Sequence, residues 1–167
     1  MPKSLADGHT KVIILATKPT NPLAPTVAEL TAGIDASCAI LSSDFNLGAV
    51  ASEKLSEKAL CQEGNIEVLG QSNYAANLSL FRYFTAGHVS DATADQAYQA
   101  LKVKGTTVWL FKRFTSRKST DAVVALDECE VYEVETDNAF DTDRQGYIKR
   151  TIPLTVQAGY LNGVVGA

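Results

Sequence analysis

Residues 65–84, NIEVLGQSNYAANLSLFRYF, constrain the fold of this chain more than any other stretch. Two strand-like runs, 65–69 and 77–84, lie on either side of a turn rich in Gly, Ser and Asn. The two-residue period of a strand gives the second run two distinct faces, with Leu78, Leu80 and Phe84 on one and Asn77, Ser79, Phe81 and Tyr83 on the other. Because both faces carry apolar or aromatic groups, we expect the central strand of a β-domain, packed on each side.

Further strands are predicted before and after this stretch. Short runs with the β-branched content or the alternation typical of strands occupy residues 11–17, 34–41, 106–114, 127–137 and 147–157. The last two are joined by a loop rich in Asp and Gly, so they predict an antiparallel hairpin. Pro153 has no amide hydrogen to donate, which predicts a strand edge or a bulge at that position.

Two helices are predicted from capping boxes. Thr26 and Glu29 form the first box, which indicates one or two helical turns, and Thr93 and Gln96 form the second. An apolar stripe continues from the second box and predicts a helix over residues 93–104. The expected fold class is therefore mainly β: a β-sandwich or partly open barrel of antiparallel strands with one flanking α-helix.

The length of 167 residues predicts a single domain over residues 11–167, preceded by a flexible N-terminal arm at 1–10. A net charge of −4 argues against binding nucleic acid by neutralising phosphates. The sequence contains no apolar run long enough to cross a membrane and no secretory signal at its start, so we expect synthesis in a cytoplasm and no membrane partner.

The connection at residues 42–60 is longer than links between strands usually are, and such loops are commonly functional or become ordered against a partner. Because it carries few apolar groups, deleting residues 46–58 is expected to leave the domain folded. The alternative is a solvated excursion with a short helix at residues 52–60.

The sequence offers little catalytic chemistry. Its two histidines, His9 and His88, are not in a metal-binding motif, and no nucleophile elbow or phosphate-binding loop is present. Six acids at residues 127–137 could supply paired carboxylates for glycoside hydrolysis, but a run of acids on a strand is more typical of a charged, solvated face. We therefore predict no catalytic residue, no metal site and no cofactor. The three cysteines, odd in number and widely spaced, are expected to be reduced thiols: Cys38, Cys61 and Cys129.

The order and spacing of these features resemble the major tail proteins, or tail tube proteins, of bacteriophages with long non-contractile tails, and most closely those of phages that infect actinobacteria. The resemblance covers residues 11–167 and is carried by LCQEGN, GQSNYAANLSLFRYF, KGTTVWLFKR, VYEVETDN and GYIKRTIPLTVQ.

This resemblance implies a structural virion protein that forms homohexameric rings, with the sheets joined into one barrel around a channel. Stacked rings would form the tail tube, with tape-measure and tail-terminator proteins as partners and viral DNA passing without specific binding. The protein would be made in the host bacterial cytoplasm and reside in the virion tail.

The resemblance also implies that the loop at 42–60 reaches the neighbouring ring. The candidate contacts in that loop are Phe45, Leu47, Glu53, Lys54, Glu57 and Lys58. The channel in this family is negative, and the candidates for lining it are Glu128, Glu130, Glu133 and Glu135.

Two alternative functions remain open. The first is a head-to-tail connector or tail-terminator ring protein, which shares the architecture but does not stack into long tubes. The second is a ligand-binding β-sandwich, prompted by the aromatic side chains of Trp109, Tyr74, Tyr83 and Tyr98.

Overall fold

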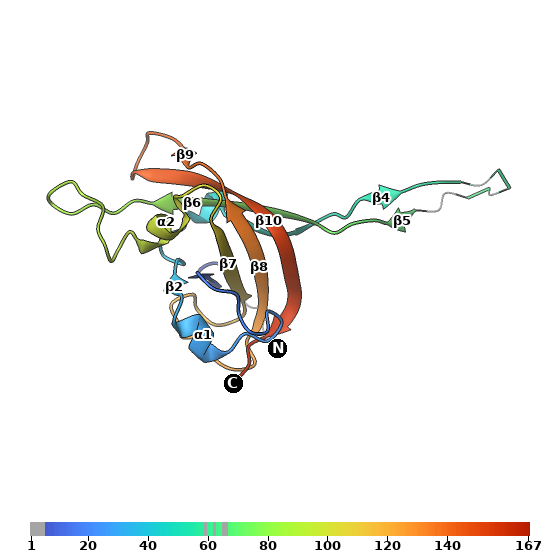
Figure 1. The fold of residues 1–167 in the computed structure, drawn as a ribbon, viewed down its shortest axis with the longest axis horizontal. Helices are drawn as coiled ribbons and strands as arrows, with labels where there is room; N and C mark the ends of the chain where they lie inside the picture. The colour runs from blue at the N-terminus through green and yellow to red at the C-terminus, as the bar shows by residue number, and fades with distance from the viewer. Residues whose placement is uncertain (1–5, 59, 62, 65–66) are drawn as a thin grey trace.

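The body of the protein is a curved antiparallel sheet, seen in a computed structural model that describes residues 6–58, 60–61, 63–64 and 67–167 (Figure 1). Among these residues the sheet has eight strands in the order β2-β1-β7-β8-β10-β6-β3, with β9 beside β10. The strands of this sheet are β1 Thr10–Leu15, β2 Ile34–Asp35, β3 Asn46–Val50, β6 Asn73–Phe81, β7 Thr107–Phe114, β8 Glu128–Thr136, β9 Phe140–Asp141 and β10 Lys149–Val164. The predicted mainly β, antiparallel fold is confirmed, and the sheet is open.

The long strand β10 holds the two halves of the sheet together. Its first residues, Lys149 to Pro153, pair with β6, and from Leu154 onward it pairs with β8. The change of partner falls at Pro153, where the sequence predicts an edge or a bulge because proline cannot donate to a ladder. The predicted hairpin of β8 and β10 is confirmed, and β10 continues to Val164, beyond the predicted end at 157.

Each face of the sheet carries its own core. The first core lies under β6, β3 and helix α2 (Gln96–Leu101), and its larger buried members include Ile14, Leu47, Leu78, Leu80, Leu101, Leu110, Tyr132 and Ile152. The second lies under helix α1 (Val27–Thr31) and includes Ile13, Leu30, Trp109, Phe111 and Val131. The strands between the cores are therefore apolar on both sides.

The helix starts differ from one another. The capping box of Thr26 and Glu29 forms as predicted at α1. The predicted box of Thr93 and Gln96 does not form, and α2 is shorter than the expected 93–104. The side chain of Asp91 instead accepts the free backbone N–H groups of this turn.

The predicted strand at 34–41 is also shortened. Only Ile34–Asp35 pair with β1, because the Asp35 side chain accepts the backbone N–H of Ser37 and turns the chain. The predicted strand 65–69 is present as β5, Val68–Leu69, while residues 65–66 lie outside the described residues.

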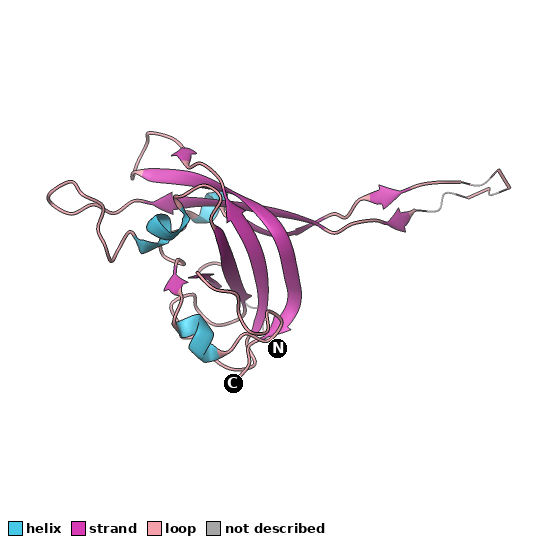
Figure 2. Cartoon of the chain, viewed as in Figure 1, coloured by secondary structure: helices cyan, strands magenta, loops and turns pink. Residues whose placement is uncertain are grey.

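The predicted long loop at 42–60 is the outgoing half of a β-hairpin that projects far from the body (Figures 1 and 2). A short 3-10 helix, Ser42–Asp44, precedes it. The outgoing strands are β3 and β4, Lys54–Leu55, which pair with β6 and β5 respectively. We call the described residues of 46–77 the arm, residues 46–50 with 73–77 its root, and the described residues between them the outer arm. The described residues of 52–60 contain no helix, which corrects the alternative of a short helix there.

Candidate assembly surfaces

The outer part of the arm presents apolar side chains to solvent. Leu55 and Val68 face each other across β4 and β5, and with Leu69 they are more than half exposed. The Nζ of Lys54 lies 2.6 Å from Oε2 of Glu67 in an exposed ion pair. A two-stranded hairpin is marginally stable by itself in water, and exposed apolar residues of this kind mark contact surfaces. These exposed side chains make the outer arm a candidate contact surface.

The six arm candidates from the sequence fall into two groups. Glu53, Lys54, Glu57 and Lys58 are exposed on the outer arm. In contrast, Leu47 is buried at the root, with 4% of its surface exposed, and Phe45 packs against the first core. These two side chains hold the arm to the body, so the surface available for contact is narrower than the sequence suggests.

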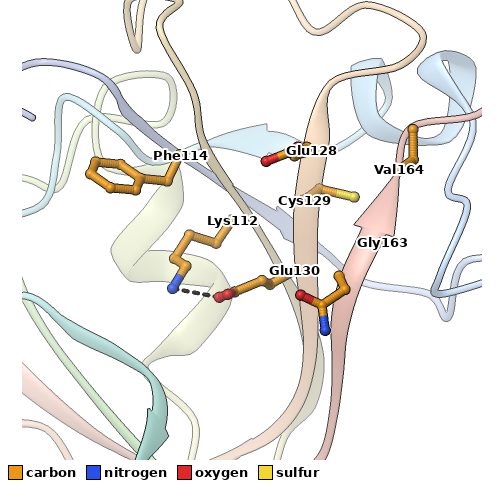
Figure 3. Close-up of a pocket in the computed structure, with 8 residues that line it drawn as sticks. Lys112, Phe114, Glu128, Cys129, Glu130, Gly163 and Val164 are labelled. Atoms are coloured by element: carbon orange, nitrogen blue, oxygen red, sulfur yellow. Dashed lines mark ion pairs between the residues drawn. The ribbon is translucent and has the colours of Figure 1, made fainter. Parts of the chain in front are cut away.

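A polar cluster ties the root of the arm to β7 and β8. Lys112 donates to the backbone carbonyl oxygen of Leu47 at 2.8 Å. Its Nζ also lies 2.5 Å from Oε2 of Glu130, the ion pair drawn in Figure 3. The hydroxyl of Tyr132 donates to the same glutamate oxygen at 2.6 Å. Burial raises the pKa of Tyr132, and its hydrogen bond to Glu130 raises it further. An open cavity of about 360 Å³ lies beside this cluster.

The four acids proposed to line a channel do not lie on one face. Alternation along β8 places Glu128 and Glu130 on the side of the first core, with Tyr132. Glu133 and Glu135 lie on the opposite side, paired across the ladder with Trp109 and Thr107. Glu130 is moreover neutralised by Lys112. The acids therefore divide into two pairs with different surroundings.

Glu133 and Glu135 belong to a polar surface that runs across the sheet, which we call the polar face. The register places Thr155 of β10 beside Glu135 of β8, and Pro153 of β10 opposite Asn77 of β6. The members of the polar face are Thr107, Glu133, Glu135, Thr155, Asn77 and Asn46, all of them exposed or half-buried. Behind this face Leu78 and Leu80 are fully buried, so the alternation seen in the central stretch separates the core from an accessible wall.

One edge of β10 is open. Beyond Pro153, β6 departs toward the arm, and between Thr155 and Asn162 the edge facing away from β8 makes no backbone–backbone hydrogen bond within the described chain. In this segment the Tyr74 hydroxyl donates to the Gly159 carbonyl at 3.5 Å. The N–H of Val164 donates to the carbonyl of Leu23 and closes the end of this edge. An unpaired edge of this length is a ready template for another strand.

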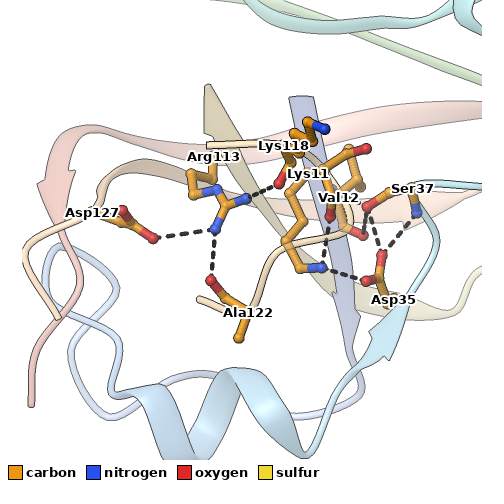
Figure 4. A network of polar contacts seen from close by, with 9 residues as sticks. Lys11, Val12, Asp35, Ser37, Arg113, Lys118, Ala122 and Asp127 are labelled. Atoms are coloured by element: carbon orange, nitrogen blue, oxygen red, sulfur yellow. Dashed lines mark hydrogen bonds and ion pairs between the residues drawn. The ribbon is translucent and has the colours of Figure 1, made fainter. Parts of the chain in front are cut away.

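Two buried ion pairs are structural. Arg113 is completely buried, and its guanidinium donates to Asp127 and to the carbonyls of Lys118 and Ala122, which ties down the loop after β7 (Figure 4). Arg82 makes a bidentate pair with the buried Asp95, from Nε to Oδ1 at 3.0 Å and from Nη2 to Oδ2 at 2.9 Å. Neither pair is predictable from the sequence, because only the fold brings these residues together.

Most of the aromatic residues that prompted the ligand-binding alternative lie in the core or pack against it. Trp109 and Tyr98 are buried, and Tyr74 packs edge to face with Tyr132 at 6.0 Å between ring centroids. Tyr83 is partly exposed beside the Arg82 pair. The core therefore accounts for most of this aromatic content.

The described residues contain no group of three His, Cys, Asp or Glu side chains placed to hold a metal ion. Within the same residues, no helix is long and apolar enough to cross a membrane.

Comparisons with known proteins agree with this architecture. A family model described as "Phage tail tube protein" matches residues 1–167. The fold is similar to that of the SPP1 tail tube, solved by solid-state NMR and cryo-EM, with a TM-score of 0.58 and 14% identity over 96% of this chain and 80% of that chain. A search among curated proteins finds no match.

Proposed function

The chain belongs to the phage tail tube protein family, and from this premise we propose that it assembles into homohexameric rings that stack into the tube through which viral DNA is delivered. The observation that carries the proposal is the open edge of β10 next to the projecting arm. Together they give one protomer two different ways to contact its copies.

The first contact is lateral. A neighbouring copy that adds a strand to the edge of β10 between Thr155 and Asn162 pairs with backbone groups that make no backbone–backbone hydrogen bond within the protomer. Repeating the contact around a ring extends the sheet from copy to copy and closes it, so that no edge is left for uncontrolled aggregation.

The second contact is axial. The arm extends beyond the body and carries Leu55, Val68 and Leu69 exposed at its outer part. We assign these residues, with the exposed charges of Glu53, Lys54, Glu57 and Lys58, to the contact with the next ring. Covering the apolar groups provides the free energy of stacking, and the charges set the register.

The polar face supplies the wall of the channel. Its members are neutral or acidic, and the carboxylates of Glu133 and Glu135 repel phosphates. Since Glu128 and Glu130 lie on the other side of β8, we assign the wall to Glu133 and Glu135.

The remaining features of the proposal follow from the family. The protein acts as a structural, non-enzymatic component of the virion tail, with tape-measure and tail-terminator proteins as partners. Assembly takes place in the cytoplasm of a host bacterium, and the likeness of its sequence motifs points to an actinobacterial host.

Negative-stain microscopy of the purified chain tests the proposal. Long tubes with a ring repeat and sixfold end views support it. Single rings that never stack favour the connector or terminator alternative, and a protein that stays monomeric under all assembly conditions favours the ligand-binding alternative.

A further inference from the structure

We propose that Lys112 is a positioning residue that sets the direction in which the arm leaves the body. The proposal rests on the arm being the contact between rings, as inferred above. Lys112 lies in the middle of the sheet on β7, yet its ammonium group reaches β3, the first strand of the arm, at the carbonyl of Leu47.

The ammonium group is held from several sides. Of its three donors, one is directed to the Leu47 carbonyl and another to Glu130, while the Tyr132 ring lies 5.7 Å from Nζ. The side chains of Lys112 and Glu130 are 16% and 34% exposed. Charge-assisted hydrogen bonds at such partly shielded positions are stronger than neutral ones.

Glu130 is held in turn. The Tyr132 hydroxyl donates to the same oxygen that pairs with Lys112, so the carboxylate has a fixed place on β8. The sheet thus fixes the position of the ammonium group. The hydrogen bond from this group to the Leu47 carbonyl in turn fixes β3, the first strand of the arm, relative to the sheet.

Because this bond lies at the root, a small change in it displaces the far end of the arm by a large distance. Leu47 lies in the root, opposite Ala76 of β6, and the ladder becomes irregular between Val50 and Lys54. With a rise of about 3.3 Å per residue, the 13 residues from Leu47 to Leu60 extend roughly 40 Å, so a tilt of about 15° at the root displaces the end by roughly 10 Å. Such a displacement is too large for a specific contact with a neighbouring ring.

Distance measurements on the soluble protomer test this role directly. Spin labels on Cys38 in the body and Cys61 in the arm, both exposed, report the spread of arm directions by double electron–electron resonance. A second pair, Cys38 with Val50→Cys in a Cys61→Ser background, reports the root alone. We expect Lys112→Met to broaden both distributions while circular dichroism shows an intact fold, and Lys112→Arg to restore much of the narrow distribution.

Controls separate this role from general stability and from the proposed function. Lys104→Met breaks a well-exposed pair with Asp137 and should leave both distributions unchanged. If Lys112→Met does not fold, the test uses Glu130→Gln, which leaves Lys112 and Leu47 in place. This variant is then expected to broaden both distance distributions. The expected effect of Lys112→Met on tube growth is a reduction in rate of about tenfold, as the loss of charge-assisted bonds implies.

Unchanged distributions in Lys112→Met, or in Glu130→Gln if the former does not fold, would overturn the positioning role. A wild-type chain that forms no tubes would instead overturn the proposed function. The distances would still decide whether Lys112 directs the arm.

Discussion

The ring of Tyr74 lies directly over Gly159. A β-carbon placed on Gly159 would come within 2.4 Å of Cε1 of Tyr74, so only glycine leaves room for the ring. Tyr74 lies at the root of the arm on β6, and Gly159 lies on β10 beyond the point where the two strands separate. The contact therefore holds β6 against β10 after their ladder has ended.

Gly159→Ala should lower the free energy of unfolding by about 1–3 kcal/mol, because the ring or the strand must move to admit the methyl group. Urea denaturation measures this change. Gly87→Ala is the matched control, since its nearest neighbour would be Oγ1 of Thr85 at 3.7 Å, an ordinary contact. If the two variants had equal free energies of unfolding, the close packing of Tyr74 on Gly159 would not contribute to stability.

The sequence predicts strands well where alternation or length identifies them. β7 and β8 lie within a residue of their predicted bounds, and Pro153 marks the change of partner in β10. The arm was predicted only as an unusual connection, because its strands are short and partner one another without a core that would impose alternation. Their pairing emerges only when residues 46–55 are placed beside residues 68–77.

The channel candidates show a second limit of sequence reasoning. The density of acids in β8 is visible in the sequence, but the strand carries buried apolar residues on both faces, so apolar alternation does not identify the side on which the acids are accessible. The partner of Glu130 is Lys112, from a different strand, and no spacing in the sequence indicates their pairing.

Asp95 should make stability depend on pH in the acid range. Burial opposes ionisation of this carboxyl, but hydrogen bonds from Arg82, Ser90 and neighbouring groups outweigh it and hold its pKa below the usual value. Because the folded-state pKa is depressed, the stabilisation is complete above the unfolded value of about 4 and is lost as the pH falls through the folded pKa.

Asp95→Asn should accordingly lower the free energy of unfolding at pH 7 by about 3–5 kcal/mol, since Arg82 loses its charged partner in a buried setting. The difference from the wild type should shrink as the pH is lowered below about 4. Thermal unfolding from pH 7 to pH 2 measures both effects. Asp141→Asn, which removes an exposed partner of Arg150, should change stability by less than about 1 kcal/mol.

The three cysteines should differ in reactivity. Burial, together with the charges of Asp127 and Glu130, raises the pKa of Cys129 to about 12, whereas Cys38 and Cys61 are exposed. At pH 8 a thiol reagent should modify two groups in the native protomer and the third only in denaturant. Rapid modification of Cys129 in the native state would contradict the burial of this side chain at the start of β8.

Removing the outer arm should separate folding from stacking. Replacing residues 51–72 by Asn-Gly joins Val50 to Asn73, which already face each other across the ladder, through a two-residue hairpin turn. The shortened chain should keep its circular dichroism spectrum and solubility, because the root and the core remain. By microscopy it should form no stacked tubes.

A deletion of residues 46–58, expected from the sequence to be tolerated, is predicted instead to be harmful. It removes the pairing of β3 with β6 and the buried side chain of Leu47. Loss of one such side chain costs about 2–5 kcal/mol even without the loss of the strand. A well-folded deletion variant would show that the root contributes little to the core.

The last prediction concerns the polar face. It compares how charge reversal on either side of β8 affects the retention of DNA in the tube. If Glu135 lines the channel, Glu135→Lys places a cation in the path of DNA, and duplex added to assembling tubes should be retained inside and protected from nuclease. Glu128→Lys changes the net charge equally from the opposite side of β8 and should leave protection at the wild-type level. Protection by Glu135→Lys should weaken from 50 to 200 mM salt, since phosphate contacts release counterions. Greater retention by Glu128→Lys than by Glu135→Lys would place the other side of β8 toward the channel.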